Sequence, residues 1–417
     1  MTTSRLYKKT LLAVAVSSLT FASQHAAAAG FQLNSQSATG LGRAFAGDAV
    51  IADNASVMSR NSAAMALFDS HQFSGGVNYI KTSIDIKDIN YVTGPIEDQN
   101  NSSGTPVPNI YYIHRLNDQW ALGAGIYSNF GTNNNFDDSF GSGTGSFPTL
   151  PAASVFGGTT EISSINYALS ASYRLNEQWS FGAGIDIVQG SGKLIRETGF
   201  PGAFNKAVDI EADGVGVGFN LGTVFELNDD NRFGLSYHYS PEIEAKGTVE
   251  YSNDPNADSI KLPLPSMLEF SGYHKIQDTK FAVHYSLQWI GWSAFDKIVT
   301  NNGVTVKDYE WKDGYHAAIG GTYYLNDAWT LRAGYMYDTA AQDQLTSISV
   351  PDSDRQWLSA GFGYHFKKHH TVDFGLTYLM GKDVKVEETL DPQVGTMLTA
   401  TTHANAWLAG IQYSYSF

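Results

Sequence analysis

Short stretches of alternating apolar and polar residues make up most of the chain. In YALSASYRL, Tyr167, Leu169, Ala171, Tyr173 and Leu175 share one face, and the intervening residues share the other. Successive side chains of a β-strand point to opposite faces, so this period of two predicts strands. Long segments of helical period are absent from the sequence. The pattern therefore predicts an all-β protein.

A 13-residue phrase recurs along the chain, as HRLNDQWALGAGI, YRLNEQWSFGAGI, YYLNDAWTLRAGY and three more degenerate copies. The six copies start 41 to 59 residues apart, at His114, Tyr173, Phe225, Tyr273, Tyr323 and Tyr364. Each copy predicts a strand, a tight turn rich in Asn and Asp, and a returning strand. Every repeat therefore holds two strands, one short turn and one long loop.

The six turns fix the number of strands. They join twelve strands, while one strand precedes the first copy, from His71, and HANAWLAGIQYSYSF forms a last one. A soluble β-sandwich shows the same alternation, but short turns at one end and long loops at the other are typical of bacterial outer-membrane barrels. Trp120, Trp179 and Trp329 follow the turns, where indole rings favour the membrane–water interface. We predict a 14-stranded antiparallel transmembrane β-barrel with both termini on the periplasmic side.

The last strand supports this location. Its apolar face carries Trp407, Ala409, Ile411, Tyr413, Tyr415 and Phe417, and the chain stops at that aromatic residue. The strand resembles the C-terminal signal by which outer-membrane barrels are recognised for insertion. It therefore predicts the barrel assembly machinery as a partner during insertion.

The N-terminus carries the pattern of a secretory signal. Arg5, Lys8 and Lys9 precede an apolar stretch, which ends in small residues before Gly30. The apolar stretch is shorter than the ~20 residues of a spanning helix, which disfavours a membrane anchor. We predict that residues 1–28 are a signal peptide and that the mature chain is a segment at 29–70 followed by the barrel at 71–417.

Composition narrows the function classes. The chain has no cysteine, which suits an oxidising compartment. Removal of the signal takes three positive charges from a chain whose net charge is already −15, and this acidity argues against nucleic acid as a partner. After the signal there is no run of 18 apolar residues, so no transmembrane helix is predicted.

Residues 29–70 lack the strand pattern and are rich in Gly, Ala, Ser and Asn. The lumen of a fourteen-strand barrel is too wide for the side chains of its own wall to fill. We therefore predict that this segment folds inside the barrel as a hatch, or plug. The alternative is a tether in the periplasm.

Four stretches, GFQLNSQSATGLGRAFAGDAVIADNASVMSRNSAAM, LPSMLEFSGYHKIQDTKFAVHYSLQWIGWSAF, KDGYHAAIGGTYYLNDAWTLRAGYMYD and SISVPDSDRQWLSAGFGY, resemble the FadL family of long-chain fatty acid outer-membrane transport proteins. The resemblance covers the whole mature chain. It implies a multi-pass outer-membrane barrel, monomeric and embedded in lipid, with an N-terminal hatch and an internal ligand pocket. It also implies a kinked third strand that opens the wall sideways, and neither a cofactor nor an enzymatic activity.

The resemblance assigns two cations to the high-affinity site, Arg196 in GKLIRETG and Lys307 in VKDYEWKDGYH. Strand parity puts Arg196 on the inward face. Parity counted back from Leu325 puts Lys307 outward, and a bulge near Gly320 and Gly321 would be needed to turn it inward.

The resemblance also assigns residues in the hatch. Phe31 matches a residue that the family places near the bound ligand, and the family's Asn-Pro-Ala motif falls on Asn61, Ser62 and Ala63. Serine replaces the proline here, which puts any rigidity that the proline lends to the hatch in question.

The kink is expected where the alternation of WALGAGIY ends after Tyr127 and SNFGTNNNF follows. Glycine accepts a bend in a strand, and an asparagine run makes a poor lipid-facing wall. Pattern and resemblance together place the kink at Ser128, Asn129, Phe130 and Gly131. An ordinary strand end that enters a long loop is the alternative.

We predict passive uptake of long-chain fatty acids or similar hydrophobic carboxylates, with lateral release into the membrane. Neutral aromatic hydrocarbons are the main alternative substrate, but they need no cation, and Arg196 favours a carboxylate unless it pairs with an inward acidic residue. The loops near 197–210 and 251–262 look shorter than in the family, so a first capture groove outside the cell is expected to be reduced or absent.

Other functions have little support in the sequence. A non-specific porin would have no hatch, and an outer-membrane lipase would be expected to carry a G-x-S-x-G motif, which the chain lacks. His369 and His370 are adjacent in a short turn, which is a poor spacing for a metal site, so no metal is predicted. No sequence resembling a TonB box follows the predicted cleavage site, which favours transport without an energy source.

Overall fold

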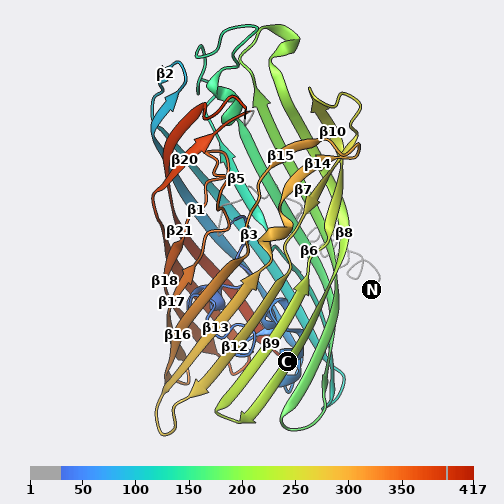
Figure 1. Ribbon diagram of the computed structural model, residues 1–417. Coiled ribbons are helices and arrows are strands. Elements are labelled where there is room, and N and C mark those ends of the chain that lie inside the picture. Colours follow the sequence, from blue (N-terminus) through green and yellow to red (C-terminus); the bar gives the residue numbers. More distant parts are fainter. Residues whose placement is uncertain (1–29, 391–392) are drawn as a thin grey trace, which may run out of the picture.

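The computed structural model describes residues 30–390 and 393–417, which form a tall barrel of strands tilted against its axis (Figure 1). The predicted signal peptide, residues 1–28, lies outside the described residues. No helix in the described part of the chain is long and apolar enough to cross a membrane.

The described wall is one sheet of twenty-one strand segments. These are β1 (Gln72–Tyr91), β2 (Gly94–Pro95), β3 (Gln99–Arg115), β4 (Trp120–Tyr127), β5 (Gly131–Asn135), β6 (Thr159–Arg174), β7 (Trp179–Glu197), β8 (Lys206–Asn228), β9 (Asn231–Tyr239), β10 (Glu242–Tyr251), β11 (Ser259–Pro263), β12 (Met267–Lys275), β13 (Phe281–Ile290), β14 (Lys297–Thr300), β15 (Thr305–Asp308), β16 (Gly314–Asn326), β17 (Trp329–Asp338), β18 (Arg355–Phe366), β19 (His370–Gly381), β20 (Val384–Glu388) and β21 (Leu398–Ser416).

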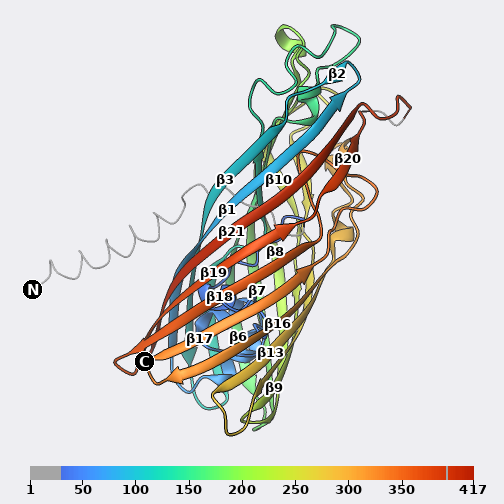
Figure 2. The same cartoon turned by 90° about the vertical axis from the view of Figure 1, so that its left-hand side faces the viewer.

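These segments make fourteen antiparallel spans, as predicted. Six spans are interrupted and consist of two segments each: β4 with β5, β9 with β10, β11 with β12, β13 with β14, β15 with β16, and β19 with β20. The short β2 pairs antiparallel with the loop end of β1. The first and last spans, β1 and β21, pair along almost their whole length, which closes the barrel (Figure 2).

All six copies of the repeated phrase form a strand, a tight turn and a returning strand. In three copies an asparagine builds the turn, because its Oδ1 accepts the backbone N–H groups of the tryptophan and of the residue before it. These asparagines are Asn117, Asn176 and Asn326. The phrase therefore recurs because each copy makes the same turn at the same edge of the barrel.

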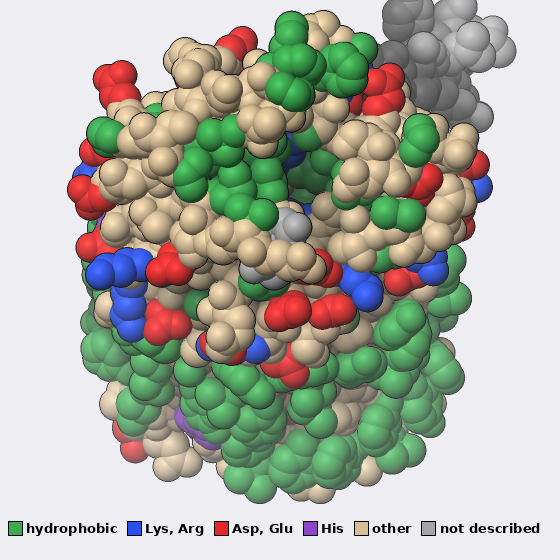
Figure 3. All heavy atoms as spheres, turned by 45° about the horizontal axis from the view of Figure 1, so that its top comes forward, with side chains coloured by type: hydrophobic (Ala, Val, Ile, Leu, Met, Phe, Trp, Pro, Cys, Tyr) green, Lys and Arg blue, Asp and Glu red, His purple; other side chains and the backbone are tan. Residues whose placement is uncertain are grey.

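The outer face of the wall is apolar. Leu169 is 66% exposed and its neighbour Ala168 is 3% exposed, which confirms the predicted alternation. In the last strand Trp407, Ile411 and Phe417 are likewise more than half exposed. Figure 3 shows apolar side chains gathered on the wall below a zone of Asp, Glu, Lys and Arg side chains near the long loops.

Residues 30–70, the N-terminal segment, lie inside the half of the barrel nearer the short turns (blue in Figures 1 and 2). The segment contains one short α-helix, α2 (Ala38–Leu41), and two 3-10 helices, η1 (Ala55–Ser59) and η2 (Ser62–Leu67). Almost all of its side chains are buried. The segment packs closely because the wall carries glycine opposite it: a Cβ at Gly182 would lie 2.2 Å from the Ala63 amide nitrogen.

Two further 3-10 helices lie in the connections at the long-loop end, η3 (Ala153–Phe156) and η4 (Gly202–Phe204), and a third, η5 (Trp292–Ala294), lies at the interruption between β13 and β14. The connections at 198–205 and 252–258 are short. The connection between β17 and β18 turns inward instead, and its residues 347–353 are buried. Figure 3 shows a hollow among these loops, with apolar side chains at its rim and a basic side chain inside.

Candidate functional site

An aromatic cluster lies at the start of the N-terminal segment. Phe31 is fully buried, and its ring lies 4.6 Å from that of Trp292 and 4.9 Å from that of Phe295, measured between centroids. Phe130 and Trp311 approach it at 6.1 and 5.7 Å. These aromatic rings belong to a larger buried apolar cluster that includes Leu194, Ile210, Ile298 and Tyr309. The interior therefore offers a continuous apolar region of the kind that a hydrocarbon chain requires.

Arg196 lies next to this cluster, on the inward face of β7. It is 6% exposed and donates hydrogen bonds to the carbonyl oxygens of Thr159 and Ile195, both at 2.7 Å, and to Thr160 Oγ1 at 2.6 Å. No carboxylate of the described residues lies within ion-pair distance of the guanidinium group. A buried guanidinium with uncharged partners retains its charge for an anionic ligand.

Lys307 also points inward, so the outward orientation expected from strand parity is wrong. Its Nζ donates to Ser347 Oγ at 2.8 Å and lies 5.5 Å from the centroid of the Tyr309 ring, which belongs to the apolar cluster. The chain breaks strand geometry at 309–313, between β15 and β16, so parity cannot be counted through this stretch. A bulge near Gly320 and Gly321 is not the cause, because pairing there is continuous on both sides.

Glu388, on β20, is a further residue of this site that no sequence motif indicated. Its carboxylate Oε2 lies 3.7 Å from Lys307 Nζ, and its Oε1 accepts the backbone N–H of Ile348 at 2.7 Å. Val386 and Glu388 are buried and alternate with the exposed Lys385 and Glu387, a pattern that signals that Glu388 faces the lumen. Glu388 meets Lys307, however, only because residues 347–353 run into the lumen.

The third span is interrupted at Ser128, Asn129 and Phe130, and it resumes as β5 rather than ending in a loop. β5 pairs only with β6, and β4 pairs with β3 only at residues 110–115. Residues 99–109 of β3 therefore pair with β1 on one side and have no strand partner among the described residues on the other. The wall has a gap in its hydrogen-bonded sheet at this position.

The N-terminal segment pairs with the interrupted span from the inside. The backbone N–H of Leu33 donates to the Asn129 carbonyl, and the N–H of Gly131 donates to the Phe31 carbonyl, both at 2.7 Å. Gln36 adds a side-chain hydrogen bond to the Ser128 carbonyl at 3.1 Å. Phe31 therefore connects the interrupted span to the aromatic cluster, a relation that the sequence did not indicate.

The family model described as "Outer membrane protein transport protein (OMPP1/FadL/TodX)" matches residues 19–417. The chain belongs to this family. It is 34% identical to the "Long-chain fatty acid transport protein" of Escherichia coli O6:H1 over 100% of both chains, and 33% identical to "Outer membrane protein P1" of Haemophilus influenzae over 99% of both. The protein is thus an outer-membrane transport protein.

Solved structures share the fold of this FadL-family chain. A Pseudomonas aeruginosa FadL homologue has a TM-score of 0.79 at 22% identity and covers 93% of this chain and 100% of its own. The Pseudomonas putida toluene transporter TodX has a TM-score of 0.67 at 19% identity and covers 94% of this chain and 100% of its own. The fourteen-strand architecture is therefore that of the family.

Asn61, Ser62 and Ala63 form the start of η2, with Asn61 as its N-cap. Asn61 is fully buried, and its Oδ1 accepts the Ala63 N–H at 3.0 Å, as a helix N-cap does. Its Nδ2 donates to the carbonyls of Ala49 and Thr223, at 2.9 and 3.1 Å, which links the N-terminal segment to β8. Ser62 occupies the first helical position, and its buried Oγ has no hydrogen-bond partner in the described chain.

We expect Ser62→Pro to raise the free energy of unfolding by about 0.5–1 kcal/mol, because proline suits the first helical position and restricts the unfolded chain. Asn61→Ala, the comparison variant, should lower it by about 1–2 kcal/mol through loss of the cap. Urea unfolding of the purified protein in micelles measures both. A loss of stability in Ser62→Pro would show that the ring does not fit against Gly182.

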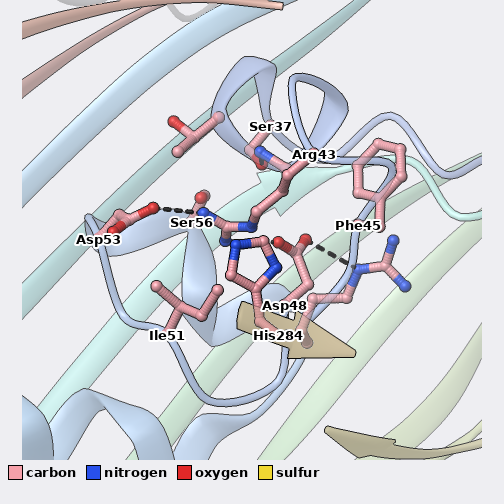
Figure 4. Close-up of polar contacts among 12 residues, drawn as sticks. Ser37, Arg43, Phe45, Asp48, Ile51, Asp53, Ser56 and His284 are labelled. Carbon is pink, nitrogen blue, oxygen red and sulfur yellow. Dashed lines mark hydrogen bonds and ion pairs between the residues drawn. The ribbon is translucent and has the colours of Figure 1, made fainter. Parts of the chain in front are cut away.

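Ion pairs fasten the N-terminal segment to the wall, and Figure 4 shows their centre at Arg43, Asp48 and Asp53. Arg43 pairs with Asp53 and, at 2.7 Å, with Asp48. Burial opposes the charged form of Asp53, but Arg43 and then Arg332 outweigh this and lower the pKa of Asp53 to about 2. Arg332 of β17 lies 3.6 Å from Asp53, so the wall shares the network.

Two more pairs complete this charge network. Arg60 of the N-terminal segment lies 3.3 Å from Glu269 of β12, and Arg332 lies 2.8 Å from Asp373 of β19. A polar cavity of about 410 Å³, lined in part by Asp53, Arg332 and Asp373, borders the network. No cluster of three or more His, Cys, Asp or Glu side chains among the described residues is arranged to hold a metal ion.

Proposed function

We propose that this protein takes up long-chain fatty acids passively, with the alkyl chain in the apolar cluster and the carboxylate at Arg196 and Lys307. The observation that carries the proposal is a pair of inward cations at the edge of a buried apolar cluster. Charge-assisted hydrogen bonds from a guanidinium and an ammonium suit a carboxylate. Two relatives carry names that agree with this choice, since they are called long-chain fatty acid transport proteins.

The N-terminal segment acts as a hatch in this proposal, and the gap beside β5 is the way out. A chain of about 16 methylenes, at about 0.8 kcal/mol each, would lose on the order of 12 kcal/mol on leaving an apolar site for water. Release through the wall into the bilayer removes most of that cost. The break at Ser128 to Gly131 and the unpaired stretch of β3 support this route.

Residues 1–28 are removed as a signal peptide, and the mature chain works as a monomer in outer-membrane lipid. The exposed aromatic face of the last strand supports insertion by the barrel assembly machinery. The proposal includes neither catalysis nor a cofactor.

Neutral aromatic hydrocarbons are the second candidate substrate. The aromatic cluster around Phe31 supports them, and structures of similar fold include a toluene transporter. Uptake of labelled oleate and labelled toluene by cells with and without the protein separates the two. Protein-dependent uptake of toluene alone would overturn the fatty acid proposal. A requirement for an added energy source in liposomes would overturn passive transport.

We expect Arg196→Ala to weaken oleate binding by about 1.5–3 kcal/mol, the usual worth of a hydrogen bond to a charged group. Oleyl alcohol, which has the same chain and no charge, should lose much less. Titration of the purified protein with both ligands measures the difference. Equal losses for acid and alcohol would mean that Arg196 supports the wall at Thr159 and Thr160 without contacting the ligand.

A further inference from the structure

The carboxylate of Glu388 is an acidic group beside a site that is proposed to bind anions. Glu388 is 8% exposed, and Ser347 Oγ donates to its Oε2 at 3.2 Å. The same oxygen faces Lys307 Nζ at 3.7 Å, while Oε1 accepts the Ile348 N–H. Three contacts therefore fix the carboxylate in place, directed at the cation.

The charges of the site can be counted. Arg196 and Lys307 contribute two positive charges, and Glu388 contributes one negative charge. Glu388 acts electrostatically on both cations, Arg196 also acts on Lys307, and Tyr309, whose phenol is neutral at pH 7, acts on Arg196. Arg196, Lys307 and Glu388 together therefore carry one net positive charge in a buried place, where an uncompensated charge is costly.

A ligand with one negative charge makes this site neutral. A neutral ligand leaves the positive charge uncompensated. A dianion leaves one negative charge in excess and faces the fixed carboxylate of Glu388, and like charges at short range repel strongly in a buried site.

We propose that Glu388 is a specificity-determining residue that sets the accepted headgroup charge to a single negative charge. It admits long-chain monocarboxylates and rejects long-chain dianions such as alkyl phosphates. The inference rests on the proposed function, because it takes Arg196 and Lys307 as the headgroup site. It adds that the site selects its ligand by the charge of the headgroup as well as by the hydrocarbon chain.

The test compares Glu388→Gln with the unaltered protein on three ligands of equal chain length: palmitate, hexadecyl phosphate and hexadecanol. At pH 8 the phosphate is a dianion, because the second pKa of a phosphate monoester is about 6. Glutamine keeps an oxygen that can accept the Ile348 N–H. The matched control is Glu387→Gln, since Glu387 is the neighbouring residue on the exposed face of β20.

We expect the unaltered protein and Glu387→Gln to prefer palmitate over hexadecyl phosphate by at least tenfold. In Glu388→Gln the phosphate should bind at least tenfold more tightly than before, while the affinity for hexadecanol stays within twofold. An unchanged ratio of phosphate to palmitate affinity would overturn the inference. Equal losses for all three ligands would also overturn it, because Glu388 would then only hold the 347–349 stretch. Failure of the unaltered protein to bind palmitate would remove the proposed function itself.

Discussion

Cross-linking β3 to β5 should reduce oleate uptake at least tenfold, and reduction of the cross-link should restore it. Asn101 Nδ2 donates to Asn134 Oδ1 at 2.7 Å across the gap, so these side chains already meet. Asn101→Cys with Asn134→Cys places the only two cysteines in the chain there. Oxidation to a disulfide then prevents the gap from widening. A short thiol-reactive linker does the same if the two sulfur atoms do not reach bonding distance.

The measurement is uptake of labelled oleate by cells before and after reduction, with the fraction cross-linked read from free thiols. Tyr112→Cys with Ala124→Cys is the control, because these residues face each other where β3 and β4 are already paired. Purified cross-linked protein should still bind oleate. Normal uptake by fully cross-linked Asn101–Asn134 protein would show that the substrate leaves by another route.

Arg43→Leu should lower the free energy of unfolding by about 3 kcal/mol and open an ion-conducting path through the barrel. Removal of one partner from a buried ion pair costs about 3–5 kcal/mol, since the other charge is left buried. The lower figure applies here because Arg60 and Arg332 still lie within 3.7 Å of Asp48 and Asp53. Single-channel conductance in planar bilayers and urea unfolding measure the two effects.

Two variants separate a loosened hatch from a weakened barrel. Arg43→Leu combined with Asp48→Asn and Asp53→Asn removes the unpaired charges, so it should recover stability and close the path. Arg355→Leu removes an arginine that is 1% exposed and paired with Asp352, outside the N-terminal segment. It should destabilise the protein without raising conductance. Conductance in Arg355→Leu equal to that of Arg43→Leu would contradict a specific role of the charge network.

The sequence by itself determined the barrel. Successive residues of a strand point to opposite faces of the sheet. The outward orientation of Leu169 and the inward orientation of Ala168 could therefore be assigned from neighbouring residues alone, without knowledge of distant contacts. The six turns could be counted because each is a local structure, and three of them are capped by an asparagine, such as Asn117, within three residues of its partners. Strand number and the outward faces follow from these local rules.

Only the tertiary structure decided how the site is assembled. Lys307 faces inward because irregular backbone at 309–313 breaks the parity count, and no local pattern encodes such a break. Glu388 meets Lys307 because the connection between β17 and β18 folds into the lumen. Phe31 reaches the interrupted third span through backbone pairing across about 100 residues of sequence. Contacts between distant segments depend on the closed shape of the barrel, which fixes the space that each inward segment must fill.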